Sequence, residues 1–252
     1  PDAACKGPLG RQLPSPCRSG VQGYRKGIEG RPCPFVASII DKGCLGMIGI
    51  VDYGAGNLGN VLRAMRFLGH EARLLANPEE KGTDPRLLVL PGVGAFPPAM
   101  KELSRRGWIP VLQEWVRKGK PLLGICLGMQ LLYERSLEDG ENKGLGFFPG
   151  EVAPLANLKK SPHMGWNRVR WVRGVSGISE GFRDGLEAYF VHGFAAPVNS
   201  VTVAETTVDG ATFSSISMAG SVAGFQFHPE RSGLEGLRFL DVFVKRLQGG
   251  NS

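Results

Sequence analysis

The sequence predicts an α/β protein with a mostly parallel central sheet flanked by helices and an antiparallel β extension. In the first half of the chain, apolar runs alternate with segments of helical periodicity, an order typical of a parallel sheet. In the second half, strand-like segments follow one another across turn signals such as Asp209-Gly210, as in antiparallel sheets. The 252 residues are 42% hydrophobic and 21% charged, which excludes a disordered or collagen-like chain and a disulfide scaffold.

The elements of the first half begin after Met47. The apolar run at 48–52 predicts a strand, and Asn57, an N-cap residue, then starts a helix that Gly69 ends. This alternation continues with strands at 72–75, 87–90 and 122–125 and helices at 97–106, 110–118 and 127–134.

The second half reads as β structure closed by one helix. Alternating or apolar runs predict strands at 147–153, 167–173, 187–192, 200–206, 211–217 and 221–227. A helix at 233–247 follows them. We expect residues 47–252 to form a single domain whose parallel core binds ligands at the carboxyl ends of its strands.

Residues 1–46 differ from the rest of the chain. They hold six Pro, eight Gly and four of the five Cys, without a period of 2 or 3.6. We interpret them as a non-native extension upstream of a natural start at Met47 and expect them to be poorly ordered. A targeting leader is the alternative interpretation.

Charge and cysteine usage narrow the classes of partner. Residues 47–252 hold 23 Lys and Arg against 20 Asp and Glu without a dense basic block, which gives little support to nucleic-acid binding. No uncharged apolar stretch reaches 18 residues, so a membrane span is excluded. Cys126 is the single cysteine of this part, and no CxxC pair provides zinc-site spacing. A reducing, cytoplasmic compartment is therefore expected.

A candidate nucleophile stands between a strand and a helix. The string Gly124-Ile125-Cys126-Leu127-Gly128 has small residues on both sides of Cys126, as a tight nucleophile elbow requires. A thiol at a helix N-terminus is also favoured as thiolate by the helix dipole. A buried structural cysteine between packing glycines is the alternative.

A candidate base follows the last predicted strand. A thiol nucleophile needs a base that later protonates the leaving group, and that base needs an orienting acceptor. His228 and Glu230, with Pro229 between them, can supply both functions. Alone, the tripeptide could equally be a capped strand end.

A third signal concerns the oxyanion that forms during acyl transfer. Backbone N–H groups must point at this oxygen. One would come from Leu127, and the other from the loop after the strand at 87–90, where Gly92, Val93 and Gly94 allow close backbone approach. A plain tight turn would explain these glycines as well.

The remaining histidines and one further turn predict no site. His70 follows the helix-ending Gly69 and is expected to face solvent, and His163 and His192 are interpreted as structural. The turn at 53–57 is similar to a phosphate-binding turn but lacks the G-x-G-x-x-G spacing, so a nucleotide site is not expected.

Together these strings resemble the class I, triad-type glutamine amidotransferases. The strings that carry the resemblance are Gly-Ile-Cys-Leu-Gly-Met-Gln at 124–130 and Phe-His-Pro-Glu at 227–230. Four more narrow it to the glutaminase subunits of imidazole glycerol phosphate synthases: Asp-Tyr-Gly-Ala-Gly-Asn at 52–57, Pro-Gly-Val-Gly at 91–94, Pro-His-Met-Gly-Trp-Asn at 162–167 and Tyr-Phe-Val-His at 189–192. The likeness runs from Met47 to the C-terminus.

The resemblance implies a role for each matched residue. Cys126 would be the nucleophile, His228 the general base and acid, and Glu230 the residue that orients His228. Gln130 and the Gly92–Gly94 loop would help to hold glutamine.

The chain departs from the family pattern at two places. Gly193-Phe194 stands where a hydroxyl residue and Tyr are usual, which puts side-chain contacts to substrate there in doubt. Arg231 stands where Lys is usual, which keeps the charge and changes its geometry toward the partner subunit.

The implied activity is hydrolysis of L-glutamine through a Cys thioester. The ammonia would pass to a (β/α)8-barrel cyclase subunit that forms imidazole glycerol phosphate and an aminoimidazole carboxamide ribotide in histidine biosynthesis. No metal or organic cofactor is implied. The partner would gate the activity by rotating the peptide at Val93. The amidotransferase subunit of another synthase and a non-catalytic regulatory relative are the alternatives, and a stand-alone esterase is a weaker one.

Overall fold

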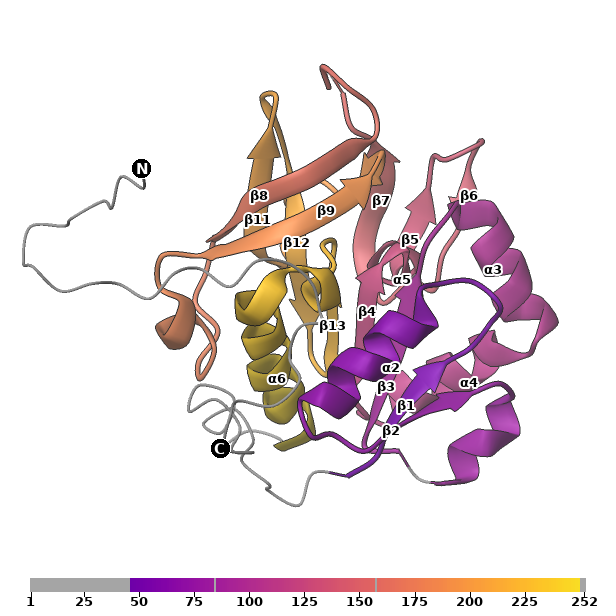
Figure 1. Ribbon diagram of the computed structural model, residues 1–252. Helices are drawn as coiled ribbons and strands as arrows, with labels where there is room; N and C mark the ends of the chain where they lie inside the picture. Colours follow the sequence, from indigo (N-terminus) through magenta and orange to yellow (C-terminus); the bar gives the residue numbers. More distant parts are fainter. Residues whose placement is uncertain (1–45, 84, 157, 250–252) are drawn as a thin grey trace, which may run out of the picture. The chain divides into compact units, whose positions relative to one another are not determined.

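The computed structural model describes residues 46–83, 85–156 and 158–249, so the predictions made for residues 1–45 lie outside the described residues. Two sheets are present, with helices on both faces of the larger one (Figure 1). The nine-stranded sheet has the order β2-β1-β3-β4-β13-β12-β11-β8-β9, and the four-stranded sheet the order β10-β7-β5-β6. The predicted α/β class with a parallel core and an antiparallel extension is confirmed.

The first half of the chain builds the parallel part of the large sheet. Its strands are β1 (Ile48–Val51), β2 (Ala72–Leu75), β3 (Leu87–Gly92) and β4 (Leu122–Cys126). The connecting helices are α2 (Leu58–Phe67), α3 (Phe96–Arg105) and α4 (Trp108–Arg117), with the short 3₁₀ helix η1 (Pro78–Thr83) before β3.

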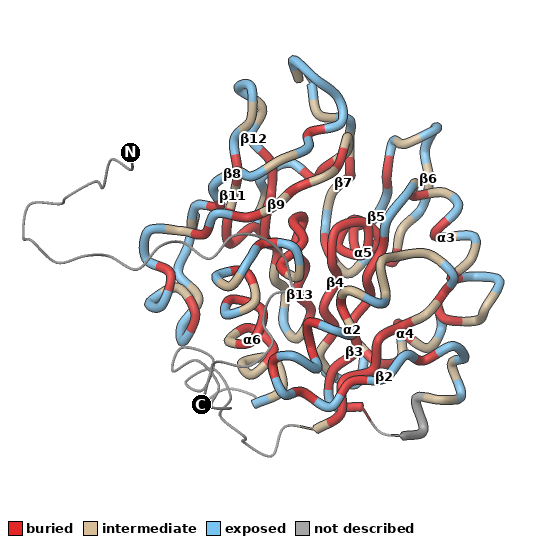
Figure 2. Tube along the Cα trace, viewed as in Figure 1, coloured by how far each residue is buried: buried red, intermediate tan, exposed pale blue. Residues whose placement is uncertain are grey.

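Alternation along the strands determines which helix covers which face. Leu87 and Val89 of β3 belong to one apolar cluster with residues of α2 and the C-terminal helix α6 (Gly233–Gly249). Leu88 and Leu90 belong to a second cluster with residues of α3 and α4. Because side chains point to opposite faces at successive positions, an unbroken apolar run fills both cores. Figure 2 shows the buried strands between these helices.

The antiparallel part is continuous with the parallel part. It consists of β8 (His163–Trp171), β9 (Leu186–His192), β11 (Thr202–Val208), β12 (Ala211–Ala219) and β13 (Val222–Phe225). Strand β13 pairs antiparallel with β12 and parallel with β4, so it joins the two halves of the sheet. The 3₁₀ helices η2 (Ser179–Phe182) and η3 (Pro229–Arg231) precede β9 and α6.

The second sheet corrects one predicted helix. The helix predicted at 127–134 is only α5 (Leu127–Leu131), and the chain continues as β5 (Tyr133–Ser136). Tyr133 pairs with Phe148, and its hydroxyl lies 2.6 Å from Ser217 Oγ, so tertiary contacts override the local helical pattern. Strands β6 (Asn142–Lys143), β7 (Phe148–Pro154) and β10 (Phe194–Ala195) complete this sheet.

Two local predictions need correction. His70 is buried rather than exposed to solvent, and its Nε2 lies 2.9 Å from Oδ1 of Asp241 in α6. Gly69, at φ +85°, turns the chain after α2 and sends the next side chain inward. Asn57 does precede α2, but its side chain makes no capping hydrogen bond.

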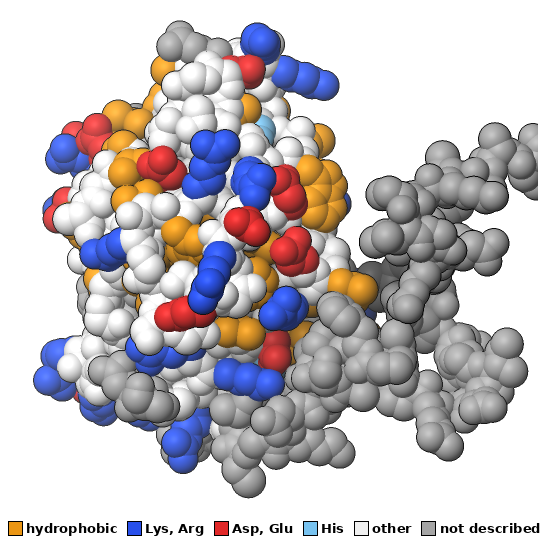
Figure 3. Space-filling view, turned by 90° about the vertical axis from the view of Figure 1, so that its left-hand side faces the viewer, with side chains coloured by type: hydrophobic (Ala, Val, Ile, Leu, Met, Phe, Trp, Pro, Cys, Tyr) orange, Lys and Arg blue, Asp and Glu red, His pale blue; other side chains and the backbone are white. Residues whose placement is uncertain are grey.

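The surface of the described residues is mixed in charge. On the face in Figure 3, Lys and Arg side chains lie among Asp and Glu side chains, and no large area carries one sign. Within the described ranges, no helix combines the length and apolar character that crossing a membrane requires.

Candidate active site

The turn from β4 to α5 places Cys126 at the carboxyl edge of the parallel strands. Cys126 itself has φ 55° and ψ −113°, a conformation that L residues rarely adopt. The glycines around it are needed for close packing: a Cβ at Gly128 would lie 1.7 Å from the carbonyl oxygen of Leu90, and one at Gly124 would lie 2.7 Å from the Gly128 carbonyl carbon. The turn therefore has the strained geometry that a nucleophile elbow requires.

His228 and Glu230 reach the same edge from the neighbouring strand. Strand β13 pairs in parallel with β4, and His228 follows it by a few residues. The His228 backbone N–H donates to the carbonyl of Tyr189 at 2.9 Å, which fixes this segment to β9. Imidazole Nδ1 lies 2.8 Å from Glu230 Oε1, and both side chains are buried.

The second nitrogen of this imidazole is available for chemistry. His228 Nε2 is buried and has no hydrogen-bond partner among the described residues. Burial disfavours the charged ring, but the neighbouring Cys126 and Glu230 outweigh it and raise the pKa of His228 to about 10. The site therefore favours the charged form of the His228 ring, between the side chains of Cys126 and Glu230.

A pocket opens beside the thiol and gathers most of the predicted binding residues. It is lined by Val93, Gly94, Cys126, Leu127, Gln130, Glu138, Val191, His192, Gly193 and Phe194. Gly92 lies just outside this lining, paired with Cys126 across β3 and β4. His228 and Glu230 do not line the pocket. The predicted residues thus fall into a buried pair and an open pocket that share Cys126.

Two polar side chains in the pocket have fixed positions. Gln130 Nε2 donates to the Phe194 carbonyl at 2.8 Å and to Gln226 Oε1 at 3.1 Å. Glu138 Oε2 accepts the Phe96 backbone N–H at 2.7 Å and so holds the start of α3 beside the Val93 loop. Sequence reasoning missed Glu138, because nothing in its local sequence distinguishes it from any loop carboxylate.

The two remaining histidines pack against each other as a neutral pair, and His192 lines the pocket. His192 donates from Nδ1 to the Phe194 carbonyl at 2.9 Å, and its Nε2 lies 3.3 Å from His163 Nδ1. Burial lowers the pKa of His192 to about 3, and burial also lowers that of His163. Neither joins a metal centre: no group of three or more His, Cys, Asp or Glu side chains in the described parts of the chain could hold a metal ion.

The departures from the family pattern have defined surroundings. Gly193 and Phe194 both line the pocket, where the carbonyl of Phe194 receives two side-chain donors. The Arg231 guanidinium stacks over the ring of Tyr189 at 4.8 Å. At positions 193–194 the chain therefore presents backbone groups to the pocket rather than side-chain hydroxyls.

Comparisons with known proteins identify the family of the chain. The model of the family "Glutamine amidotransferase class-I" matches residues 49–247. The imidazole glycerol phosphate synthase subunit HisH of Aquifex aeolicus is 42% identical over 200 residues, which cover 79% of the chain and 96% of that subunit. The HisH subunit of Streptococcus gordonii is 47% identical over 201 residues, with 78% and 95% covered. A solved glutamine amidotransferase matches at a TM-score of 0.64 and 20% identity, over 81% of this chain and 100% of that one.

Proposed function

The chain belongs to the class-I glutamine amidotransferase family, and we propose that Cys126, His228 and Glu230 carry its reaction. Its likeness to nearly the whole length of HisH subunits makes it the glutaminase subunit of imidazole glycerol phosphate synthase, in histidine biosynthesis. The observation that carries the site proposal is the burial of the His228 and Glu230 pair beside Cys126, at adjoining strand ends.

The reaction proceeds through a thioester. The Cys126 thiolate attacks the side-chain amide carbon of glutamine and forms a tetrahedral oxyanion. His228 then gives its Nε2 proton to the departing nitrogen, and ammonia leaves as the thioester forms. The now neutral imidazole takes a proton from water, whose oxygen attacks the thioester and releases glutamate. Glu230 holds Nδ1 throughout at 2.8 Å, so Nε2 keeps its direction.

The oxyanion is stabilised by backbone N–H groups. Leu127 supplies one, because it follows the nucleophile and opens α5. The Gly92–Gly94 loop supplies the second, since β3 ends beside Cys126. Val93 is exposed between two glycines, and Gly94 has φ +98°. Rotation of the peptide before Val93 switches the second donor, and the partner subunit controls this rotation.

The pocket binds glutamine by its polar ends. Glu138 is the one carboxylate of the lining, so it binds the α-ammonium group of the substrate. Gln130 borders the pocket, with its amide nitrogen held by Phe194 and Gln226. The backbone of Gly193 and Phe194 supplies polar groups on this side of the pocket.

The partner is a (β/α)8-barrel cyclase subunit that docks on β8. Met164 and Trp166 are the most exposed large apolar side chains among the described residues, at 62% and 58%, and they share one face of this strand. Tyr189 and Arg231 continue the face toward His228. Since free ammonia is mostly protonated at neutral pH, a docked acceptor keeps it nucleophilic. We expect no nucleic-acid or membrane partner, and we place the complex in the cytoplasm.

Glutamate release from glutamine tests this function. The full chain is measured with and without the cyclase subunit and its ribonucleotide substrate, beside Cys126→Ala. We expect release that rises at least about tenfold with the partner and falls to background in Cys126→Ala. Equal release with and without the cyclase would point to another synthase. Release that survives Cys126→Ala would refute the nucleophile.

A further inference from the structure

One buried hydroxyl beside the proposed oxyanion site has no assigned role. Tyr53 follows β1, and its side chain is fully buried. Its hydroxyl makes no hydrogen bond to any described residue, although it is shielded from solvent. Buried hydroxyls are normally paired, since an unpaired one loses its bonds to water without replacement. An unpaired hydroxyl in this position therefore suggests a second state in which it has a partner.

The hydroxyl lies against the end of β3, where one half of the proposed oxyanion hole begins. A Cβ added at Gly92 would lie 2.6 Å from Tyr53 Oη, 2.9 Å from the Gly128 backbone nitrogen and 2.9 Å from Leu127 Cβ. The hydroxyl thus lies close to Gly92 at the end of β3, and Gly92 in turn lies close to the first turn of α5. Burial and then the charge of Cys126 raise the pKa of Tyr53, so the hydroxyl keeps its proton and remains a donor.

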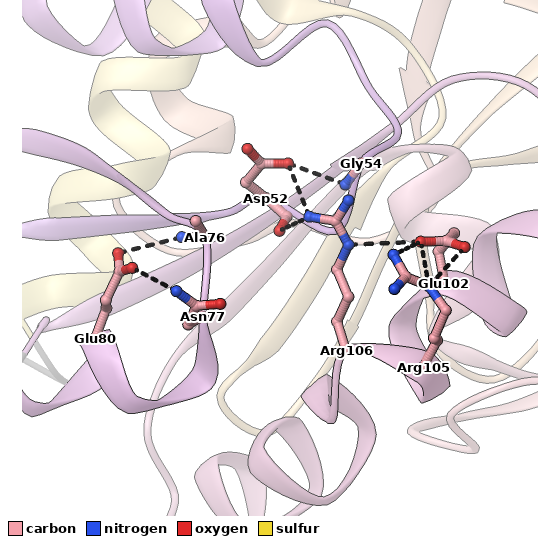
Figure 4. A network of polar contacts seen from close by, with 8 residues as sticks. All are labelled: Asp52, Gly54, Ala76, Asn77, Glu80, Glu102, Arg105 and Arg106. Atoms are coloured by element: carbon pink, nitrogen blue, oxygen red, sulfur yellow. Dashed lines mark hydrogen bonds and ion pairs between the residues drawn. The ribbon is translucent and has the colours of Figure 1, made fainter.

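The turn that carries Tyr53 is held in place by a charged clamp, drawn in Figure 4. Asp52 Oδ1 accepts the Gly54 backbone N–H at 2.9 Å, and Arg106 donates to the Asp52 carbonyl at 3.3 Å. Arg106 is held in turn by Glu102, 3.5 Å away. On the other side of the turn, a Cβ at Gly56 would lie 3.5 Å from the Pro91 carbonyl oxygen. The backbone on both sides of Tyr53 is therefore held in place.

We propose that Tyr53 is a positioning residue whose hydroxyl donates to the carbonyl of Gly92 when the Gly92–Val93 peptide rotates to aim its N–H at the oxyanion. The contact at Gly92 is where this peptide begins, so rotation brings its carbonyl within reach of the hydroxyl. The hydrogen bond exists only in the rotated state, and it stabilises that state relative to the resting one. This inference rests on the proposed function and adds a residue to it.

Tyr53→Phe tests the proposal, because it removes the hydroxyl and keeps the ring. Acylation of Cys126 by p-nitrophenyl acetate passes through an oxyanion, whereas alkylation by iodoacetamide does not. Both rates are measured on the full chain after subtraction of the Cys126→Ala rates. We expect acylation to slow about tenfold and alkylation to stay within about twofold. With the cyclase bound, kcat for glutamine falls about tenfold and KM stays within about twofold.

Tyr133→Phe is the matched control. Tyr133 is also buried, but its hydroxyl already bonds Ser217, so its loss should lower the unfolding midpoint and leave acylation unchanged. Unchanged acylation in Tyr53→Phe, or an equal loss in Tyr133→Phe, would overturn the proposal. Acylation needs neither glutamine nor partner, so a wild-type chain without glutaminase activity would refute the proposed function separately.

Discussion

His228 keeps its charge against the effect of its own burial. Among the described histidines, His192 shows the opposite result: without a carboxylate beside it, burial lowers its pKa to about 3. Next to Cys126 and Glu230, the pKa of His228 rises instead to about 10. The opposite pKa shifts of these two buried histidines thus come from the side chains of Cys126 and Glu230 beside His228.

Glu230→Gln tests whether the Glu230 carboxylate raises the pKa of His228 and so makes stability depend on pH. An unfolded histidine titrates near 6.5. The charged ring therefore stabilises the fold fully below about pH 6.5, and this stabilisation is lost as pH rises through about 10. Without the carboxylate the folded pKa drops, so the loss should be complete at a lower pH, and glutamine hydrolysis at pH 7.5 should fall at least about tenfold.

Two measurements check this prediction. NMR titration of the imidazole gives the pKa of His228, and urea unfolding across pH gives the stability. Glu235→Gln, an exposed carboxylate on α6, is the control and should change neither. An unshifted His228 pKa in Glu230→Gln would contradict the assignment of Glu230.

At the scale of single residues, sequence patterns locate groups tied to backbone motifs and miss the others. Cys126 and His228 each follow a predicted strand, so the sequence placed both at strand ends, but their shared edge depends on the parallel pairing of β13 with β4. Glu138 reaches the pocket only because β5 and its loop turn back beside α3, a path with no local signal. His70 was misplaced because its partner, Asp241, is 171 residues away.

The elbow between β4 and α5 requires glycine at position 128, where there is no room for a side chain. We expect Gly128→Ala to lower the free energy of unfolding by about 2–3 kcal/mol and to abolish activity, because its Cβ would meet the Leu90 carbonyl oxygen. Gly59→Ala is the control: it is exposed in α2, where alanine favours the helix by up to about 1 kcal/mol. Urea unfolding of both variants measures the two changes in the free energy of unfolding. A wild-type stability for Gly128→Ala would show that β3 moves to accommodate the methyl group.

At the scale of elements, long strands were predictable and short ones were not. The run at Leu87–Leu90 is apolar at every position, as in a strand buried on both faces. Strands β6 and β10 have two residues each and exist through their partners. The parallel pairing of β13 with β4 also lacked a local signal, since β13 follows β12 across a hairpin turn.

At the scale of the whole molecule, the exposed face of β8 should decide assembly. We expect Trp166→Ala to weaken binding of the cyclase subunit at least about tenfold, because a large aromatic at the centre of an interface carries much of its affinity. Val172→Ala is the control, 50% exposed just beyond the end of the same strand. Calorimetric titration gives both affinities, and unfolding curves verify the fold. Wild-type affinity in Trp166→Ala would show that the cyclase subunit docks on another surface of the chain.

The order of segments along the chain also determines the order in which its functional parts are synthesised. Strand β4 ends at Cys126, and the proposed base His228 follows β13, 102 residues later. At roughly 5–20 residues per second, a ribosome needs about 5–20 s to make that stretch. During this interval the nascent chain already contains β8, while Cys126 still lacks His228. If the proposed docking strand and the proposed base are correct, the docking strand is thus synthesised before the chain can release ammonia.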